Sequence, residues 1–209
     1  MALVSAQKMK KAIAHISSVD AKMATHISNH PLCTIGRTPS PETHFESLVS
    51  SVISQQLAIK AAMTIHDRLK DLSGGTITPA KVAKLKEVDL RAVGVSGAKA
   101  KTILGLCNAA LSGDIAINEL HLIDDDEVIF DQLTSLWGIG PWTVDMFMMF
   151  QLGRLDIWPT GDLGVRRGWE RIHKLKEEIE PKALELKGEK FRPYRSVVAW
   201  YCWRAVDSK

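Results

Sequence analysis

The stretch LWGIGPWTVDMF, residues 136–147, places a Gly-Ile-Gly turn directly before a proline and an amphipathic segment. Apolar residues recur with helical spacing over residues 128–136, and Pro141 suits the first position of a second helix, where its missing N–H costs nothing. The stretch therefore predicts two helices joined by a tight turn. Gly138 and Gly140 can supply positive φ angles and remove side chains that would block a close approach.

The turn has a chemical use if it lies at the surface. A helix start leaves backbone N–H groups unpaired and carries the positive end of the helix dipole, which together suit a phosphate. Thr143 could add a hydroxyl or cap the turn. An ordinary corner between two helices has the same pattern, so the turn alone leaves both interpretations open.

Nearly every other segment also has the period of a helix, and convincing strand alternation is hard to find, so the sequence predicts an all-α protein. Helices are expected over residues 3–27, 43–55, 58–71, 79–86, 87–93, 97–112, 115–121, about 124–136, 141–151, a short stretch from 163, 173–187 and 193–206. With 209 residues, the chain can fold as one globular unit or as two small ones.

Composition excludes some classes and leaves others open. No apolar run approaches the length of a membrane span, and the first residues lack a secretory signal, which places the protein inside a cell. The three cysteines are far apart and suggest neither a disulfide framework nor an iron–sulfur cluster. A net charge of +3 permits a polyanionic partner without requiring one. All six tryptophans lie between positions 137 and 203, where they could form a core or a stacking pocket.

Five motifs, taken in order, resemble one family. The hairpin pattern of Leu133, Leu136, Gly138, Ile139, Gly140 and Thr143 resembles that of the helix-hairpin-helix DNA glycosylases. The other four are ISQQL (53–57), similar to a minor-groove loop, GVSGAKA (94–100), similar to a Gly-x-Ser-x-x-Lys-Ala segment, WPTGD (158–162), similar to a Pro-x-x-Asp context, and RPYRS (192–196) with the later Trp203. The last is similar to the Pro-Trp-Arg-Ser…Trp segment of the DNA-3-methyladenine glycosylase II branch. The resemblance extends from about residue 43 to 206.

The resemblance implies two helical subdomains with the helix-hairpin-helix motif and an active-site cleft between them. Residues 40–152 would form a central bundle with the wedge loop and the hairpin. Residues 1–39 plus 153–209 would form the second subdomain, with the catalytic aspartate and the C-terminal helices. Too few residues precede the first motif to build the N-terminal β-rich domain of some members, so we expect the compact form.

The resemblance also assigns the catalytic residue. Asp162 would face a flipped-out nucleotide, where its carboxylate stabilises the positive charge that develops on C1′ and orients a water. The alternative for Asp162 is a structural role as a helix N-cap, which aspartate often fills. Asp156 is a backup candidate in the connector before it.

Trp142 occupies the position at which bifunctional relatives such as endonuclease III carry a catalytic lysine. Tryptophan cannot form a Schiff base with the sugar, so we expect base release without strand cleavage. Trp142 and Trp203 would form aromatic pocket walls for a cationic methylated purine. Met146 and Leu163 would complete the pocket, at positions where some relatives place tyrosine. Packing between the hairpin helices is the alternative for Trp142.

The DNA contacts implied by the resemblance come from three places. Gln56 and Leu57 resemble the plug and wedge that fill the gap left by an extruded base, with a helix end and a core leucine as the alternative. A second phosphate could bind at the helix start that carries Ser96 and Lys99, which could equally be a solvated face. With the hairpin, the expected DNA-binding residues are Gln56, Leu57, Ser96, Lys99, Gly138, Ile139, Gly140 and Thr143.

No cofactor is expected, apart from one ion suggested by analogy. Family members often hold a monovalent cation with hairpin carbonyls, which here would be those of Thr134, Leu136 and Ile139.

Together these residues predict a monofunctional DNA N-glycosylase that excises alkylated purines, 3-methyladenine and also 7-methylguanine, from duplex DNA in base-excision repair. It would act as a monomer, with no membrane partner, in the cytoplasm beside a bacterial nucleoid or in a nucleus. The alternative is a non-catalytic binder of abasic or damaged DNA with the same fold. A lyase like endonuclease III is disfavoured by Trp142 and by the absent cluster cysteines.

Overall fold

The computed structural model describes residues 3–207, and all regular secondary structure within them is helical, which confirms the predicted all-α class. The α-helices are α1 (Ala6–Val19), α2 (Ala21–Ser28), α3 (His44–Ser54), α4 (Ile59–Leu72), α5 (Pro79–Val82), α6 (Glu87–Ala92), α7 (Gly97–Ser112), α8 (Asp126–Thr134), α9 (Pro141–Met146), α10 (Leu163–His173), α11 (Pro181–Gly188) and α12 (Arg195–Asp207). Short 3₁₀ segments, η1 (Ile117–Leu122) and η3 (Glu189–Phe191), and a π-helical turn, η2 (Phe147–Gln151), complete the set.

The chain divides into two compact units. Unit 1 comprises Met1–Pro39 and Met148–Lys209, and unit 2 comprises Ser40–Phe147. The division therefore falls after Phe147, whereas the sequence analysis assigned residues 148–152 to the central bundle. Each unit has its own core and is described separately.

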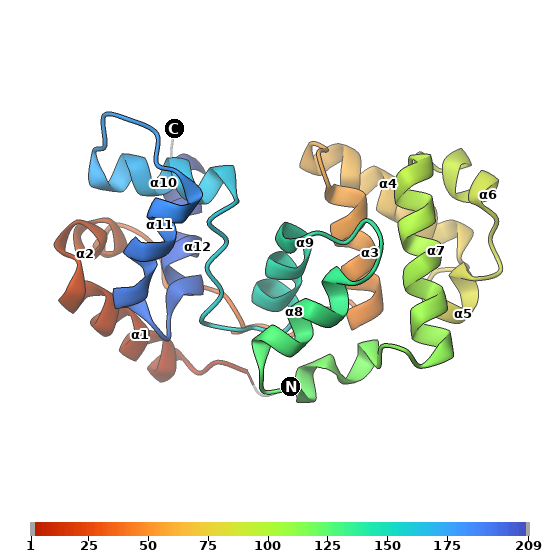
Figure 1. Ribbon diagram of the computed structural model, residues 1–209, viewed down its shortest axis with the longest axis horizontal. Helices are drawn as coiled ribbons and strands as arrows, with labels where there is room; N and C mark the ends of the chain where they lie inside the picture. Colours follow the sequence, from red (N-terminus) through yellow and green to blue (C-terminus); the bar gives the residue numbers. More distant parts are fainter. Residues whose placement is uncertain (1–2, 208–209) are drawn as a thin grey trace. The chain divides into compact units, whose positions relative to one another are not determined.

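Unit 2 is built around α7, the long helix that packs against α3, α5 and α6 (Figure 1). Helices α3 and α4 pack against each other and are joined by the short loop 55–58, which we call the wedge loop. Helices α8 and α9 form the expected hairpin, and α9 also packs on α3. The wedge loop and the hairpin are therefore both attached to α3.

Unit 1 is centred on the close pair α10 and α12, with α1 and α2 packed against it. The approach of α10 to α12 depends on Gly168, where an added Cβ would lie 1.9 Å from the carbonyl oxygen of Cys202. The glycine thus sets the spacing of the two helices that carry Asp162 and Trp203. All three cysteines are buried free thiols.

Several predicted helix boundaries are wrong. The expected helix over residues 3–27 is broken at Asp20, whose side chain accepts a hydrogen bond from the Met23 N–H and starts α2. The expected helix over residues 173–187 begins only at Pro181, because α10 ends in a left-handed residue, Lys174. The segment after α9 is a π-helical turn rather than a continuous α-helix.

Among the helices of residues 3–207, none combines the length and the apolar composition that spanning a lipid bilayer requires.

Candidate functional site

The hairpin turn owes its two glycines to two different constraints. Gly138 has a φ of +82°, and an added Cβ would lie 2.0 Å from the Thr102 hydroxyl on α7. A side chain at this position is therefore excluded both by the backbone angle and by packing inside unit 2. The neighbouring Ile139 is buried and anchors the turn in the core.

Gly140 has the opposite surroundings. An added Cβ would meet no atom within 4 Å, and its φ of −97° is open to any residue. Gly140 is the N-cap of α9, so the exposed backbone at this point belongs to the positive end of a helix. Nothing in its surroundings requires a glycine here, and a phosphate contact at this backbone stays a prediction.

The wedge loop is fastened to the hairpin by Gln55. Its side-chain amide donates to the Gly138 carbonyl oxygen at 3.2 Å and to the Thr143 hydroxyl at 2.9 Å. Thr143 is only 2% exposed, so its hydroxyl serves this internal contact. The loop and the turn consequently form one structural element.

Lys99 fastens the other side of the wedge loop. Its ammonium donates to the carbonyl oxygens of Ile53, at 2.9 Å, and Gln55, at 2.7 Å, and so caps the end of α3. Burial lowers the pKa of this ammonium. Ser96 caps α7 by accepting a hydrogen bond from the Lys99 N–H at 3.4 Å. Both residues have structural roles, and a phosphate contact at either stays a prediction.

Gln56 and Leu57 project from the fastened loop. Gln56 takes a left-handed φ of +55°, which is uncommon for a residue other than glycine, and its side chain is exposed. Leu57 is 40% exposed, so it is not the core leucine of the alternative interpretation. The two side chains are presented outward, as a plug and a wedge would be.

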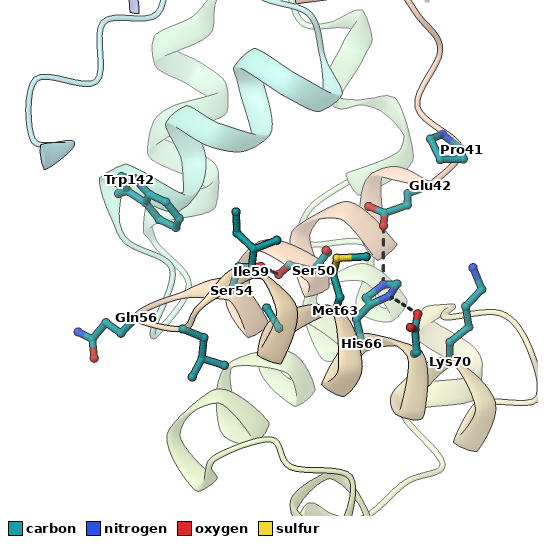
Figure 2. Close-up of a pocket in the computed structure, with 13 residues that line it drawn as sticks. Pro41, Glu42, Ser50, Ser54, Gln56, Ile59, Met63, His66, Lys70 and Trp142 are labelled. Carbon is teal, nitrogen blue, oxygen red and sulfur yellow. Dashed lines mark hydrogen bonds and ion pairs between the residues drawn. The ribbon is translucent and has the colours of Figure 1, made fainter. Parts of the chain in front are cut away.

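A cavity of about 620 Å³ opens beside the wedge loop. Figure 2 shows Gln56 and Trp142 toward one end of it and Glu42, His66 and Lys70 toward the other. The lining residues are Pro41, Glu42, Ser50, Ser54, Gln56, Leu57, Ile59, Ala62, Met63, His66, Asp67, Lys70 and Trp142. Trp142 is therefore partly exposed to a cavity rather than enclosed between the hairpin helices.

In unit 1, Asp162 is held by two hydrogen bonds. Its Oδ1 accepts from the Val165 N–H at 2.9 Å, which makes it the N-cap of α10, and from the indole N–H of Trp203 at 2.9 Å. The aspartate thus has the structural role foreseen as an alternative, in addition to whatever chemistry it performs. The side chain is half-buried and fixed in orientation.

An aromatic surface adjoins this carboxylate. The rings of Trp203 and Phe150 lie 5.6 Å apart with their planes tilted by 34°, and Phe150 is 51% exposed. Leu163, next to Asp162, is also exposed. Trp142 and Met146 belong to unit 2, so the four predicted pocket residues are divided between the two units.

The backup candidate, Asp156, is committed to an ion pair. Its carboxylate accepts from the guanidinium of Arg195 at 2.9 Å and 3.0 Å and from that of Arg192 at 2.9 Å. Ser196 adds a hydrogen bond from the Ile157 N–H to its hydroxyl at 2.8 Å. The RPYRS motif therefore anchors the connector that leads to Asp162.

The sequence analysis missed the site residues Gln55, Phe150 and Gly164. An added Cβ at Gly164 would lie 2.8 Å from Trp203, so this glycine allows the indole to reach Asp162. The four-residue spacing of Gly164 and Gly168 on one helix was the available signal, because small residues at that spacing mark a close helix contact. Gln55 lies inside the ISQQL motif, but nothing in the motif distinguished its role from that of Gln56, and for Phe150 the sequence offered no comparable signal.

The carbonyls proposed as cation ligands lie at the end of α8 and in the turn. The Leu136 oxygen accepts the Ile139 N–H at 3.1 Å. A carbonyl oxygen has two lone pairs, so it can still ligate an ion. A monovalent cation at the carbonyls of Thr134, Leu136 and Ile139 stays a prediction.

Two observations define the class of protein. The helical hairpin has an unobstructed glycine at a helix start, and it is tied to a loop with an exposed apolar tip. These are the parts of a helix-hairpin-helix protein. The family model described as "HhH-GPD superfamily base excision DNA repair protein" matches residues 49–193. The chain belongs to this superfamily.

Individual relatives agree with that assignment. DNA-3-methyladenine glycosylase 1 of Schizosaccharomyces pombe is 33% identical over 199 residues, which cover 94% of this chain and 87% of the relative. The crystal structure of a DNA-3-methyladenine glycosidase from Bacillus halodurans matches with a TM-score of 0.83 and 34% identity, over 94% of this chain and 89% of that one. The S. pombe 3-methyladenine DNA glycosylase in complex with abasic DNA matches with a TM-score of 0.80 and 31% identity, over 93% and 95%.

Proposed function

We propose that this protein is a DNA glycosylase that removes alkylated purines, 3-methyladenine above all and also 7-methylguanine, from duplex DNA in base-excision repair. The observation that carries the proposal is the carboxylate of Asp162, which is oriented by the Val165 N–H and the Trp203 indole in a chain of this superfamily. The similar proteins named for 3-methyladenine support the choice of substrate.

The reaction is hydrolysis of the bond between the base and C1′ of its deoxyribose. As that bond breaks, positive charge develops on C1′ and the ring oxygen. Asp162 stabilises this charge and orients the water that attacks C1′. Because its carboxylate is already fixed by two donors, little reorganisation is needed when the charge appears.

The aromatic surface beside Asp162 suits the leaving base. Methylation at N3 or N7 gives a purine a positive charge, and a cation is attracted to the faces of rings such as those of Trp203 and Phe150. A cationic base is also a good leaving group, so the step requires neither a strong general acid nor a cofactor. These rings therefore favour alkylated over undamaged purines.

Unit 2 supplies the DNA contacts of the proposal. A phosphate would bind at the backbone of Gly140, and Lys101, whose ammonium lies 4.3 Å from the ring centre of Trp137 in the same turn, would add positive charge to the hairpin. Leu57 and Gln56 would enter the duplex from the minor groove and fill the space of the flipped nucleotide. One chain carries all of these parts, so we propose that it acts as a monomer, wherever the cell keeps its DNA.

Two further points complete the proposal. Trp142 has no amine with which to form a Schiff base, so the abasic strand is left uncut. The hairpin carbonyls of Thr134, Leu136 and Ile139 hold a monovalent cation. The contribution of this cation to DNA binding is measured as the ratio of the DNA affinity in potassium chloride to that in choline chloride, whose cation is too large for the site.

The test is release of 3-methyladenine from methylated DNA by the wild type and by Asp162→Asn. Asparagine is an equally good N-cap and can still accept the indole hydrogen bond, so the variant should fold and bind DNA. Without the negative charge, release should fall by at least about 100-fold, the usual size of one lost electrostatic contact to a transition state. Asp71→Asn, at an exposed position of α4, controls for the change of net charge.

Equal release by Asp162→Asn and the wild type would refute the assignment of Asp162. Tight binding of abasic DNA by a wild type that releases no base would instead establish the non-catalytic binder.

A further inference from the structure

Glu42 and His66 line the end of the unit 2 cavity away from Trp142 (Figure 2), and Glu46 completes a cluster of three ligand-type side chains with them. One ligand atom each from Glu42, Glu46 and His66 lies within 4.8 Å of the other two. The His66 Nε2 is 3.8 Å from an oxygen of each glutamate. The catalytic proposal uses none of these residues.

The cluster is partly buried, and two of its ligand atoms make no hydrogen bond. The side chain of Glu46 is 8% exposed and that of His66 is 13% exposed. The Glu46 Oε1 and the His66 Nε2 are both inaccessible to solvent and make no hydrogen bond. Burial raises the pKa of the Glu42 carboxyl. Buried polar atoms without hydrogen bonds cost free energy, so an ion that bonds to the His66 nitrogen, which makes no hydrogen bond, and to the Glu46 oxygen, which has only ion-pair contacts, would be stabilising.

We propose that Glu42, Glu46 and His66 bind a divalent transition-metal ion of the zinc type. Zinc bonds to imidazole nitrogen and carboxylate oxygen at about 2.0–2.2 Å, which places the ligand atoms of a tetrahedral site about 3.4 Å apart. The two His66–glutamate separations of 3.8 Å would shorten by roughly 0.4 Å, and any separation at the 4.8 Å limit by roughly 1.4 Å, changes that side-chain rotations can supply. An imidazole ligand favours zinc over magnesium or calcium, and the cavity leaves room for a water as the fourth ligand.

Lys70 is the natural competitor of the ion. Its ammonium lies 3.2 Å from the same Glu46 oxygen, and its side chain is 43% exposed. An exposed lysine can turn into solvent when a metal takes the oxygen. Metal binding should therefore displace one ion pair and leave the helices in place.

The position of the site gives the ion a mechanical role, which rests on the proposed function. Glu42 and Glu46 lie at the start of α3, and His66 lies on α4. The wedge loop joins these two helices, so an ion held by both would cross-link the pair on which Gln56 and Leu57 are mounted. We expect the bound ion to stiffen the support of the wedge.

The experiment titrates metal-free protein, in the absence of DNA, with Co²⁺ as a coloured substitute for Zn²⁺, followed by displacement with Zn²⁺. The expected result is one equivalent of Co²⁺ per chain with the visible spectrum of a four-coordinate site, and a higher melting temperature with Zn²⁺. His66→Gln and, separately, Glu42→Gln should weaken binding by at least about tenfold. His15→Gln, in unit 1 and outside the cluster, should bind as the wild type does.

Lys70→Gln provides a test in the opposite direction, because removing the competing ammonium should tighten metal binding. If the cluster is only an ion-pair network centred on a protonated His66, no stoichiometric metal binds and the proposal is overturned. Binding that survives both His66→Gln and Glu42→Gln overturns it as well. Asp162→Asn should bind Co²⁺ normally, so a failure of this proposal and a failure of the catalytic proposal are distinguishable.

Discussion

Gly140→Asp is the substitution that most directly tests the phosphate contact. The added Cβ meets no atom within 4 Å, and the backbone angle is ordinary. Position 140 is the N-cap of α9, where aspartate is preferred over glycine by a few tenths of a kcal/mol. The variant should therefore fold normally and melt at the same temperature as the wild type or slightly above it.

Its effect on DNA affinity follows from charge. A carboxylate about 4 Å from a phosphate is repelled by about 1 kcal/mol in bulk water and by about 4 kcal/mol near a protein surface of low dielectric. A mid-range value of about 2 kcal/mol corresponds to a roughly 30-fold larger dissociation constant, that is, to weaker binding. Gly140→Asn has the same shape and capping ability without the charge, so the Asp-to-Asn ratio isolates the repulsion.

The assay is fluorescence anisotropy with a duplex that contains an abasic site, at low and at moderate salt. The difference between the two variants should shrink as salt rises, because exposed charges are screened. Gly138→Ala is the contrasting variant: its Cβ would lie 2.0 Å from the Thr102 hydroxyl at a φ of +82°, so it should lose at least about 2 kcal/mol of stability. Equal DNA affinity of Gly140→Asp and Gly140→Asn at low salt would mean that this turn does not face a phosphate.

Three further substitutions test the supports of the site and the stability of unit 1. Lys99→Met removes two hydrogen bonds to the end of α3 and should lower the free energy of unfolding, measured in urea, by about 1–3 kcal/mol. The same variant should extrude less of a fluorescent base from duplex DNA. Gly164→Ala should push the Trp203 indole away from its carboxylate and slow base release while DNA affinity holds; unchanged release would show that this hydrogen bond is dispensable. Burial alone would raise the pKa of the Asp20 carboxyl. Hydrogen bonds, foremost from Lys190, outweigh this effect and bring the pKa down to about 2. The stabilisation is therefore fully present above about pH 4 and is lost as the pH falls through 2, so Asp20→Asn should cost about 2 kcal/mol at neutral pH and progressively less as the pH approaches and passes below 2 in pH-dependent melting.

The success of the sequence-based helix assignments depends on whether local residues mark the helix ends. The expected helix over residues 97–112 matches α7, because Ser96 caps its start and Gly113 follows its end in a left-handed conformation. The segment 173–187 failed because charged residues give a strong helical pattern, and nothing marks the left-handed turn at Lys174. At Asp20 the capping residue was visible, but apolar spacing continued across it.

The site residues divide in the same way. Asp162 and the hairpin glycines were predictable because each lies in a motif with a fixed local order. The contacts of Gln55 and Lys99 were not, because their partners lie 44 or more residues away and depend on how α3, α7 and α9 pack. Motif order alone gives no distance, and the expected placement of Trp142 and Trp203 in different subdomains came from the family resemblance; the two units of the structure also separate these residues.

Under the proposed function, the double use of Asp162 has an evolutionary consequence. A residue that serves as both reagent and helix cap is exchanged at least cost for another capping residue, because a residue that cannot cap α10 would cost roughly 0.5–2 kcal/mol of stability. The few permitted replacements, such as asparagine or serine, keep the architecture but silence the chemistry. A lineage could thus pass from excising damaged bases to merely binding damaged DNA in one codon change, with no intermediate that fails to fold.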